Sequence, residues 1–321
     1  MKFPIFDLHC DSAFKLLGAD FSATDNLYRN KNHIDLCRAK QLPGYAQCFA
    51  CFTTPWDDLP GKLTVEDVFE RELSVILREL NANTDIIRQA YSAADVEENR
   101  KAGIMSAILT IEGPAGFGYD PSLLENLHQI GFRVTTLGWN EKNILTGSHK
   151  TGGGLTDLGR EYVKEAQRLG MLIDVSHISD EAFWDIMQIT NAPVIATHSN
   201  SRAICDVTRN LTDDMFRAIC QTGGVVGLNL YSEFLGQSSD MDTACNHVLH
   251  FLELDPSGRH IALGGDLDGC DTLPKDFNGI QDYPVLADRL LLRGASEQNI
   301  KNIFWNNALG VIDSAVCNNK K

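Results

Sequence analysis

The sequence predicts a single α/β domain folded as a (β/α)8 TIM barrel. Short apolar segments rich in β-branched residues alternate with longer segments of helical periodicity, and eight such strand segments can be counted. Strands that alternate with helices are typical of parallel sheets with right-handed crossovers, and eight strands are what a closed barrel requires. No linker or change of composition divides the 321 residues, so we expect one domain over residues 1–321, with a frayed tail at about 317–321. An open, doubly wound sheet is the alternative architecture.

The predicted elements follow one another along the whole chain. The expected strands are Phe3–Leu8, Tyr45–Phe52, Ser106–Ile111, Phe132–Leu137, Met171–Val175, Pro193–Thr197, Gly224–Leu230 and His260–Gly264. Amphipathic segments between them, expected to be helices, include Val65–Tyr91, Asp157–Leu169, Asp180–Thr190, Thr212–Gln221 and Asp242–Leu254.

The ends of several predicted helices carry capping residues. Thr156, Ser179 and Thr212 each precede an aspartate, which places an N-cap hydroxyl and an acidic first turn at the start of the helix. Gly170 and Gly223 lie where a C-cap glycine is expected. These signals fix the helix boundaries better than hydrophobic periodicity does.

The composition argues against several classes of partner and location. A net charge of −15 repels phosphate backbones and anionic lipid, so we expect neither nucleic-acid nor membrane binding. The N-terminal residues do not resemble a secretory signal, and no apolar run is long enough to span a bilayer. Nine scattered cysteines favour reduced thiols in a cytoplasmic protein. Cys48 and Cys51 form a C-x-x-C, but they lie in a strand-like segment that does not suit a redox pair.

The first predicted strand ends in two residues that can bind a metal, His9 and Asp11. Side chains alternate along an extended segment, so residues two apart point the same way. Cys10, between them, is expected to point elsewhere. In a barrel, functional side chains gather where strands end and βα loops begin. We therefore expect the imidazole and the carboxylate to face the same cavity.

Three more such residues follow other strands: Glu112 after the third, His177 after the fifth and His198 after the sixth. Each alone has an ordinary explanation as a hydrogen-bonded loop residue or a helix cap. Independent loop residues, however, need not share one end of four strands. Imidazole and carboxylate ligands suit zinc, with manganese, cobalt and iron as competitors. Five ligands exceed the needs of one open tetrahedral zinc and suit two metals that share a carboxylate and activate a hydroxide.

An acidic segment follows the eighth predicted strand. Asp266 is the first carboxylate beyond the strand, so we expect it to face the metal cavity and to transfer a proton to the leaving group. Asp268 is expected to order the loop. The alternative is a turn in which either aspartate caps the backbone.

The remaining candidates are weaker. Gly152–Gly154 lacks the strand and the Lys-Ser/Thr of a phosphate loop, and a serine-hydrolase G-x-S-x-G is missing from the sequence. Structural roles are expected for the histidines away from the predicted strand ends, namely His33, His128, His247, His250 and His260.

Several ordered motifs resemble the renal (membrane) dipeptidase family, a zinc branch of the amidohydrolase-like barrels. The resemblance is strongest from Leu124 to Asp268 and, with His9–Asp11 and Glu112, spans nearly the whole chain. The motifs that carry it are Gly154–Arg160, Arg168–His177, Ala192–Ser199, Arg209–Leu211 and Gly264–Gly269.

The resemblance implies a role for each metal ligand. By it, His9 and Asp11 bind one zinc, His177 and His198 bind the second, and Glu112 bridges the two. Relatives in the wider superfamily use a carbamylated lysine as the bridge. Lys142 stands after the fourth predicted strand, but Glu112 makes it unnecessary.

The resemblance also implies how a dipeptide is held. Asp266 matches the proton-transfer acid, Arg209 matches the arginine that receives the substrate carboxylate, and Tyr231 matches a tyrosine near the pocket. It further suggests that a D-residue is tolerated at the C-terminal position and that the protein is a homodimer.

One position departs from the family. Trp139 stands where the animal enzymes carry a histidine that helps to bind the substrate and polarise its carbonyl. An indole N–H donates one hydrogen bond but cannot become a cation. His149, in the following loop, could take over that role. Cys205 lies where the secreted enzymes have a bridged cysteine, and here we expect a free thiol.

The leading hypothesis is a cytoplasmic dipeptidase with two zinc ions per chain, in which a metal-bridging hydroxide attacks the scissile carbonyl. The first alternative is another amide or ester hydrolase on the same centre, for example an N-acyl amino acid hydrolase, which the Trp139 change permits. The second is a barrel that has kept its fold as a non-catalytic binding module. The complete set of five ligands argues against the second, because a decayed site would be expected to lose one.

Overall fold

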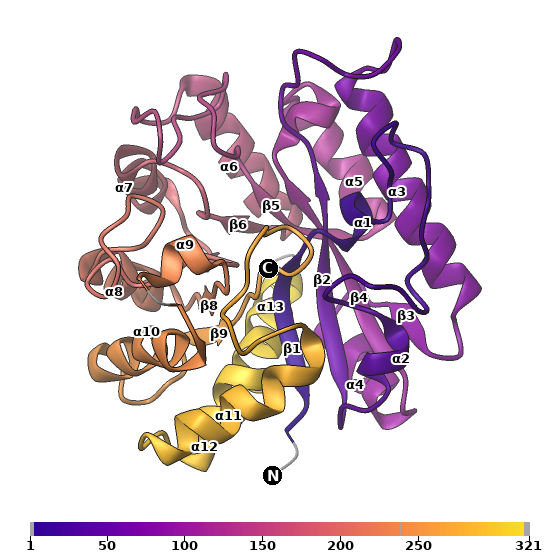
Figure 1. Ribbon diagram of the computed structural model, residues 1–321. Helices are drawn as coiled ribbons and strands as arrows, with labels where there is room; N and C mark the ends of the chain where they lie inside the picture. Colours follow the sequence, from indigo (N-terminus) through magenta and orange to yellow (C-terminus); the bar gives the residue numbers. More distant parts are fainter. Residues whose placement is uncertain (1–2, 238, 318–321) are drawn as a thin grey trace.

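The computed structural model, described for residues 3–237 and 239–317, confirms the (β/α)8 barrel. Eight parallel strands follow one another in the order β7-β6-β5-β4-β2-β1-β9-β8, and an isolated parallel bridge between Ala196 and Val226 joins the two ends of this order. The helices lie around the outside of the strands (Figure 1). The barrel strands are β1 (Ile5–Cys10), β2 (Tyr45–Phe52), β4 (Met105–Glu112), β5 (Phe132–Thr136), β6 (Leu172–Asp174), β7 (Val194–Ile195), β8 (Val226–Leu228) and β9 (Ile261–Leu263).

Helices of varied length connect and cover these strands. The α-helices are α1 (Ser12–Lys15), α2 (Leu36–Ala39), α3 (Val65–Ala82), α4 (Ala93–Lys101), α5 (Leu124–Ile130), α6 (Asp157–Leu169), α7 (Asp180–Ile189), α8 (Asp213–Thr222), α9 (Ser232–Leu235), α10 (Met241–Leu254), α11 (Tyr283–Leu292), α12 (Glu297–Lys301) and α13 (Asn307–Cys317). Short 3-10 helices are η1 (Pro114–Phe117), η2 (Pro121–Leu123) and η3 (Ile280–Asp282), and η4 (Asn302–Asn306) is a π-helix.

The predicted helix Val65–Tyr91 is too long. The helix ends at Ala82, and a ninth strand, β3 (Ile87–Gln89), pairs with β4 beside the barrel strands. Asn83 ends the helix: its carbonyl accepts hydrogen bonds from the backbone N–H groups of Ile86 and Ile87, and its side chain donates to a carbonyl in the last turn. Ile86 and Ile87 are both β-branched, which favours the strand that follows. Hydrophobic periodicity alone could not separate the two elements.

The predicted caps are confirmed. The hydroxyls of Thr156, Ser179 and Thr212 each accept a backbone N–H from the first turn of α6, α7 and α8. Gly170 and Gly223 end α6 and α8 with φ of 79° and 81°, a left-handed conformation that costs glycine little. Of the predicted frayed tail, Cys317 is the last residue of α13, and residues 318–321 lie outside the described part.

Two buried clusters form the core. The larger one packs the outer faces of the strands against the helices. The smaller one contains Phe6, Leu8 and Ile108, which alternate with residues of the larger cluster and therefore line the barrel interior. Trp305 and Ile312 join this inner cluster, so η4 and α13 close the end of the barrel at which the strands begin.

The cysteine pair in β2 lies on both faces of the strand. Cys48 belongs to the inner cluster and Cys51 to the outer one, as expected for residues three apart in a strand. The two thiols therefore point apart and are free. Among the described residues, no helix has the length and hydropathy needed to cross a membrane.

Two glycines allow β7, β8 and β9 to approach closely below the strand ends. A Cβ atom added to Gly227 would lie 1.9 Å from the carbonyl oxygen of Thr197, and one added to Gly264 would lie 1.7 Å from the same oxygen. Backbone atoms cannot be displaced as easily as a flexible side chain, so only glycine fits at either position.

Replacing Gly264 by alanine should therefore lower the free energy of unfolding by at least about 2 kcal/mol, because the methyl group overlaps a backbone carbonyl. Urea titration followed by circular dichroism measures this. The matched control is Gly310→Ala in α13, where no atom lies within 4 Å of the added Cβ. The control should be neutral or stabilising by about 0.5–1 kcal/mol. Equal stability of the two variants would contradict this close approach.

Candidate metal centre

The ends of four strands bring five side chains with metal-binding atoms into one buried group. His9 lies in β1 and Asp11 directly follows it, Glu112 is the last residue of β4, His177 follows β6 and His198 follows β7. All five are at most 6% exposed. The predicted gathering of these residues at the strand ends is what the structure shows.

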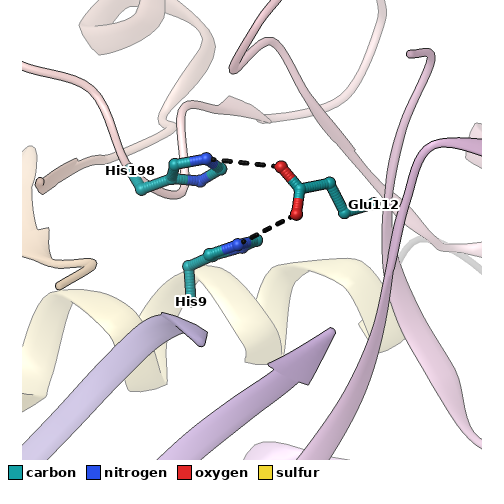
Figure 2. A group of neighbouring side chains, drawn as sticks. All are labelled: His9, Glu112 and His198. Atoms are coloured by element: carbon teal, nitrogen blue, oxygen red, sulfur yellow. Dashed lines mark ion pairs between the residues drawn. The ribbon is translucent and has the colours of Figure 1, made fainter. Parts of the chain in front are cut away.

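Glu112 lies at the centre of the group. Its Oε2 is 3.3 Å from Nε2 of His9, and its Oε1 is 2.9 Å from Nε2 of His177 and 3.6 Å from Nε2 of His198. In Figure 2 the rings of His9 and His198 approach different oxygens of the same carboxylate. Asp11 Oδ2 is 3.4 Å from Nε2 of His9. One carboxylate thus faces three imidazoles, which is the geometry that a bridging ligand needs.

Local backbone geometry directs these side chains. The pairing of β1 with β2 shifts register between Asp7 and Cys10, and Cys10 packs into the outer core while His9 faces the site. His177 and Asp266 have φ of 72° and 57°. Non-glycine residues rarely adopt this left-handed conformation, and it is found most often at functional turns.

A chain of hydrogen bonds holds His198. The hydroxyl of Thr197 donates to Asp174 Oδ2, and Oδ1 of that aspartate accepts the backbone N–H of Thr197 at 2.9 Å. The single hydroxyl proton is thereby used, so Thr197 Oγ1 accepts from Nδ1 of His198 at 2.7 Å. The Nε2 atom of His198 then keeps its lone pair and faces Glu112.

An amide oxygen fixes His177 in the same way. Oδ1 of Asn140 lies 3.1 Å from Nδ1 of His177 and 2.8 Å from Nε2 of His149. An amide oxygen only accepts, so both rings donate to it. The free lone pair of His177 is therefore on Nε2.

His177 and His198 are both neutral. Burial lowers the pKa of each ring well below the usual value, and the positive charges of Arg209 and His9 nearby lower it further.

Several polar atoms in the group lack the partner that burial requires. Nε2 of His177 and Nε2 of His198 are 2.8 Å apart, yet both carry lone pairs and cannot hydrogen-bond to each other. Nε2 of His9 and Oδ1 of Asp11 have no hydrogen-bond partner. Leaving such groups unsatisfied costs free energy, and a cation among them would satisfy all of them. Imidazole and carboxylate together fit zinc and similar divalent metals.

The ligand atoms form two overlapping groups of three within 4.8 Å: one of His9, Glu112 and His198, the other of His9, Asp11 and Asp266. Because Asp266 belongs to the second group, it is a further candidate ligand, whereas the sequence suggested it only for proton transfer. Burial and the charge of Asp11 raise the pKa of Glu112 to about 8 without a metal.

Asp266 follows β9 and is mostly buried. Its Oδ1 is 3.9 Å from Nε2 of His9, and its Oδ2 accepts a hydrogen bond from Asn229 Nδ2 at 3.1 Å. Asp268 instead orders the loops: Oδ2 accepts the hydroxyl of Ser12 at 2.6 Å, and Oδ1 accepts the backbone N–H of His33 at 2.6 Å. These contacts agree with the loop-ordering role expected for Asp268.

A pocket of about 420 Å³ opens onto this group. Glu112, Asp266, Trp139, His149 and Tyr231 line it. The Trp139 ring lies 5.1 Å from the ring of Phe52 and 6.2 Å from that of His177, measured between centroids. Burial lowers the pKa of His149 to about 3, so this ring is neutral at the pocket wall. Lys142 is exposed, away from the group.

Arg209 lies behind the pocket wall and does not line it. Its Nη1 donates to Ser199 Oγ at 2.7 Å and its Nη2 to the carbonyl of His198 at 2.9 Å, while the guanidinium covers the ring of Phe234 at 5.5 Å. The side chain is buried and its Nε has no partner. Within residues 3–237 and 239–317, no carboxylate lies within ion-pair distance of it. It is a buried cation without an anion, and burial lowers its pKa.

Sequence reasoning missed the residues that orient the histidines, namely Asn140, Asp174 and Thr197. Two of them stand inside motifs already singled out, directly before or near a ligand. For Asp174, the last residue of β6, the signal that could have found it is a polar residue at a buried strand position, because such a residue must be hydrogen-bonded. Asn140 and Thr197 lie outside the strands and carry no such signal.

Several known proteins are similar to this chain over most of its length. The family model described as membrane dipeptidase (peptidase family M19) matches residues 1–321. A Klebsiella pneumoniae protein, described as an uncharacterized protein in the pqqA 5′ region, is 33% identical over 77% of this chain and 95% of its own. Dipeptidase aclJ of Aspergillus oryzae is 29% identical over 97% of this chain and 78% of its own.

A solved structure shares the fold over nearly the whole chain. It is a metallopeptidase from Rhodobacter sphaeroides liganded with a phosphinate mimic of the dipeptide L-Ala-D-Ala. The two superpose with a TM-score of 0.87 at 26% identity, and the match covers 98% of this chain and 100% of that one.

Replacing Thr197 by valine should weaken metal binding, because it removes the hydrogen-bond acceptor for Nδ1 of His198. Neither the orientation of the ring nor its tautomer is then fixed. Loss of such an orienting partner typically costs about 10–100-fold in affinity. Titration of metal-free protein with Zn²⁺ against a chromophoric chelator measures it. Thr110→Val is the matched control, because the buried Thr110 hydroxyl has no hydrogen-bond partner. Equal zinc affinity of both variants and the wild type would contradict this role of Thr197.

Proposed function

Because the chain belongs to the membrane dipeptidase family, we propose that it is a hydrolase that cleaves dipeptides on a centre of two zinc ions. The observation that carries this is the buried Glu112 carboxylate, which faces three imidazoles at the base of a pocket. The proposed ligands are His9 and Asp11 for one ion, His177 and His198 for the other, and Glu112 as the bridge between them.

Zinc in this position would supply a nucleophilic water at neutral pH and polarise the scissile carbonyl. The residues around it supply the rest. Neutral His177 and His198 present lone pairs to the site, and their partners hold the rings in place. The pocket limits the substrate to small molecules, in accord with a dipeptide and not a long polypeptide.

Asp266 is the proposed proton carrier. It is close to His9 and held by Asn229, so its carboxylate can move a proton to the amine released when the peptide bond breaks. Burial and the charge of Asp11 raise its pKa, which favours uptake of a proton by this carboxylate.

Arg209 is the proposed partner of the substrate carboxylate. A buried guanidinium with a free N–H, and with no carboxylate within ion-pair distance in the described part of the chain, favours an anionic ligand. Tyr231 and Trp139 line the pocket and are proposed to contact the substrate.

We also propose that a D-residue is accepted at the C-terminal position, in line with the ligand of the Rhodobacter sphaeroides structure. Trp139 favours one alternative, another amide or ester hydrolase such as an N-acyl amino acid hydrolase, because the indole cannot supply a positive charge to the carbonyl oxygen. The complete ligand group argues against a non-catalytic binding barrel. A cytoplasmic location and a homodimer stay predictions from the sequence.

Elemental analysis of the purified protein should find about two zinc-like ions per chain. A panel of L–L and L–D dipeptides, tripeptides and N-acyl amino acids then separates the two hydrolase activities by kcat/KM. Dipeptides should be cleaved and N-acyl amino acids should not. A folded, metal-free protein would contradict both activities, and cleavage of acyl amino acids alone would favour the alternative.

Asp266→Asn should lower kcat about 10²–10⁴-fold, because the amide cannot carry a proton, and should leave the metal content unchanged. Asp58→Asn is the matched control, because Asp58 is exposed and does not line the pocket, so it should be dispensable. Loss of a metal ion from the Asp266→Asn variant would indicate that Asp266 is a metal ligand and not the proton carrier. Unchanged kcat would refute its role in proton transfer.

A further inference from the structure

Three aromatic side chains form one side of the pocket. Phe14 of α1, Phe52 at the end of β2 and Trp139 after β5 all line it. The centroids of Phe14 and Phe52 are 5.6 Å apart, and those of Phe52 and Trp139 are 5.1 Å apart, both in edge-to-face contact. Such contacts hold aromatic rings in fixed orientations. We call these three residues the aromatic wall.

A second layer supports the aromatic wall. The Trp56 ring stacks on Phe14 at 6.2 Å and meets Phe52 edge-on at 5.6 Å, without lining the pocket itself. Phe21 packs on Phe14 and Trp56 at 6.0 and 5.8 Å, one layer farther out. The wall is thus a preformed apolar surface, backed by other rings and in place before a ligand binds.

The rest of the pocket is mostly polar, apart from Tyr231, Phe234 and Cys270. Its acidic residues follow β8 and β9: Glu233 lies in α9, and Asp266 and Asp271 lie in the loop after β9. Lys150 lies in the loop after β5, and in the ring of strands β1, β2 and β4 come between β9 and β5. The aromatic wall therefore begins beside the acidic side, where Lys15 of α1 also lines the pocket, and ends beside Lys150.

This order matches a dipeptide zwitterion with an apolar side chain. An ammonium group is favoured beside the acids and a carboxylate beside Lys150. A side chain between them then lies against rings and not against water. Neither the metal group nor the charged loops require an apolar surface, so the wall has no part in the proposed chemistry other than contact with the substrate.

We propose that the aromatic wall of Phe14, Phe52 and Trp139 selects dipeptides that carry a large apolar side chain. This inference rests on the proposed dipeptidase function and names the substrate class within it. Transfer of such a side chain from water to the wall favours the larger substrate, and apolar pockets typically discriminate by about 10–200-fold between side chains of different size.

Two dipeptide series test the wall, Xaa-Ala and Ala-Xaa, with alanine, leucine or phenylalanine as Xaa. In at least one series, kcat/KM for leucine or phenylalanine should exceed that for Ala-Ala by about tenfold or more. Phe52→Ala should reduce this ratio to less than about threefold, since it removes the central ring of the wall. Phe14→Ala is the second variant, on the short helix α1, in case the first does not fold.

Phe21→Ala is the matched control. It removes the same side chain from the same set of contacting rings, but from a position that does not line the pocket, so the ratio should stay at the wild-type value. Folding of each variant is checked by thermal unfolding and by its bound zinc.

The outcomes separate the two proposals. If Ala-Ala is cleaved and large apolar side chains give no advantage in either series, the wall has no role in selection and the dipeptidase function still stands. A ratio that is unchanged in both folded wall variants would also overturn the inference. If no dipeptide in the panel is cleaved, the proposed function fails and the inference fails with it.

Discussion

The burial of one carboxylate among three imidazoles is the constraint on which the rest of the site depends. Glu112 is almost completely buried, so its charge must be balanced by groups that converge on it. Convergence from four different strands requires a closed ring, because only a barrel brings the ends of β1, β4, β6 and β7 around one axis. The close approach of β7, β8 and β9 at Gly227 and Gly264 is part of that closure.

Hydrogen bonds, and not charged groups in direct contact with the rings, orient His177 and His198. Asp174 accepts two hydrogen bonds from Thr197, one from its backbone N–H and one from its hydroxyl, and the hydroxyl oxygen accepts a hydrogen bond from His198. The side-chain oxygen of Asn140 accepts a hydrogen bond from His177 directly. Both arrangements leave the ring neutral, which is the form that binds metals.

The sequence predicts the barrel and the gathering of the five candidate ligands because both depend on simple periods. Strand alternation places His9 and Asp11 on one side, and the structure keeps them close together even though the pairing of β1 shifts register between Asp7 and Cys10. What it could not predict depends on three-dimensional partners. The burial of Arg209 behind Phe234 and the coupling of Asn140 to two histidines arise from loops whose paths are not encoded in a periodic pattern. The end of α3 at Asn83 was missed because a helix and the short strand after it share apolar residues.

The floor of the barrel has a consequence for how the chain is made. Trp305 and Ile312 complete the inner cluster around Phe6, so residues from the first and last parts of the chain pack together there. Strand β1 also needs β9 as a neighbour. On the ribosome, therefore, the N-terminal strand waits for almost the whole polypeptide before its apolar face is covered. Contacts between such distant residues form slowly, and the nascent chain exposes an unpaired strand edge meanwhile. The same packing that gives the site a rigid base therefore leaves the apolar face of β1 uncovered until the residues around Ile312 have been made.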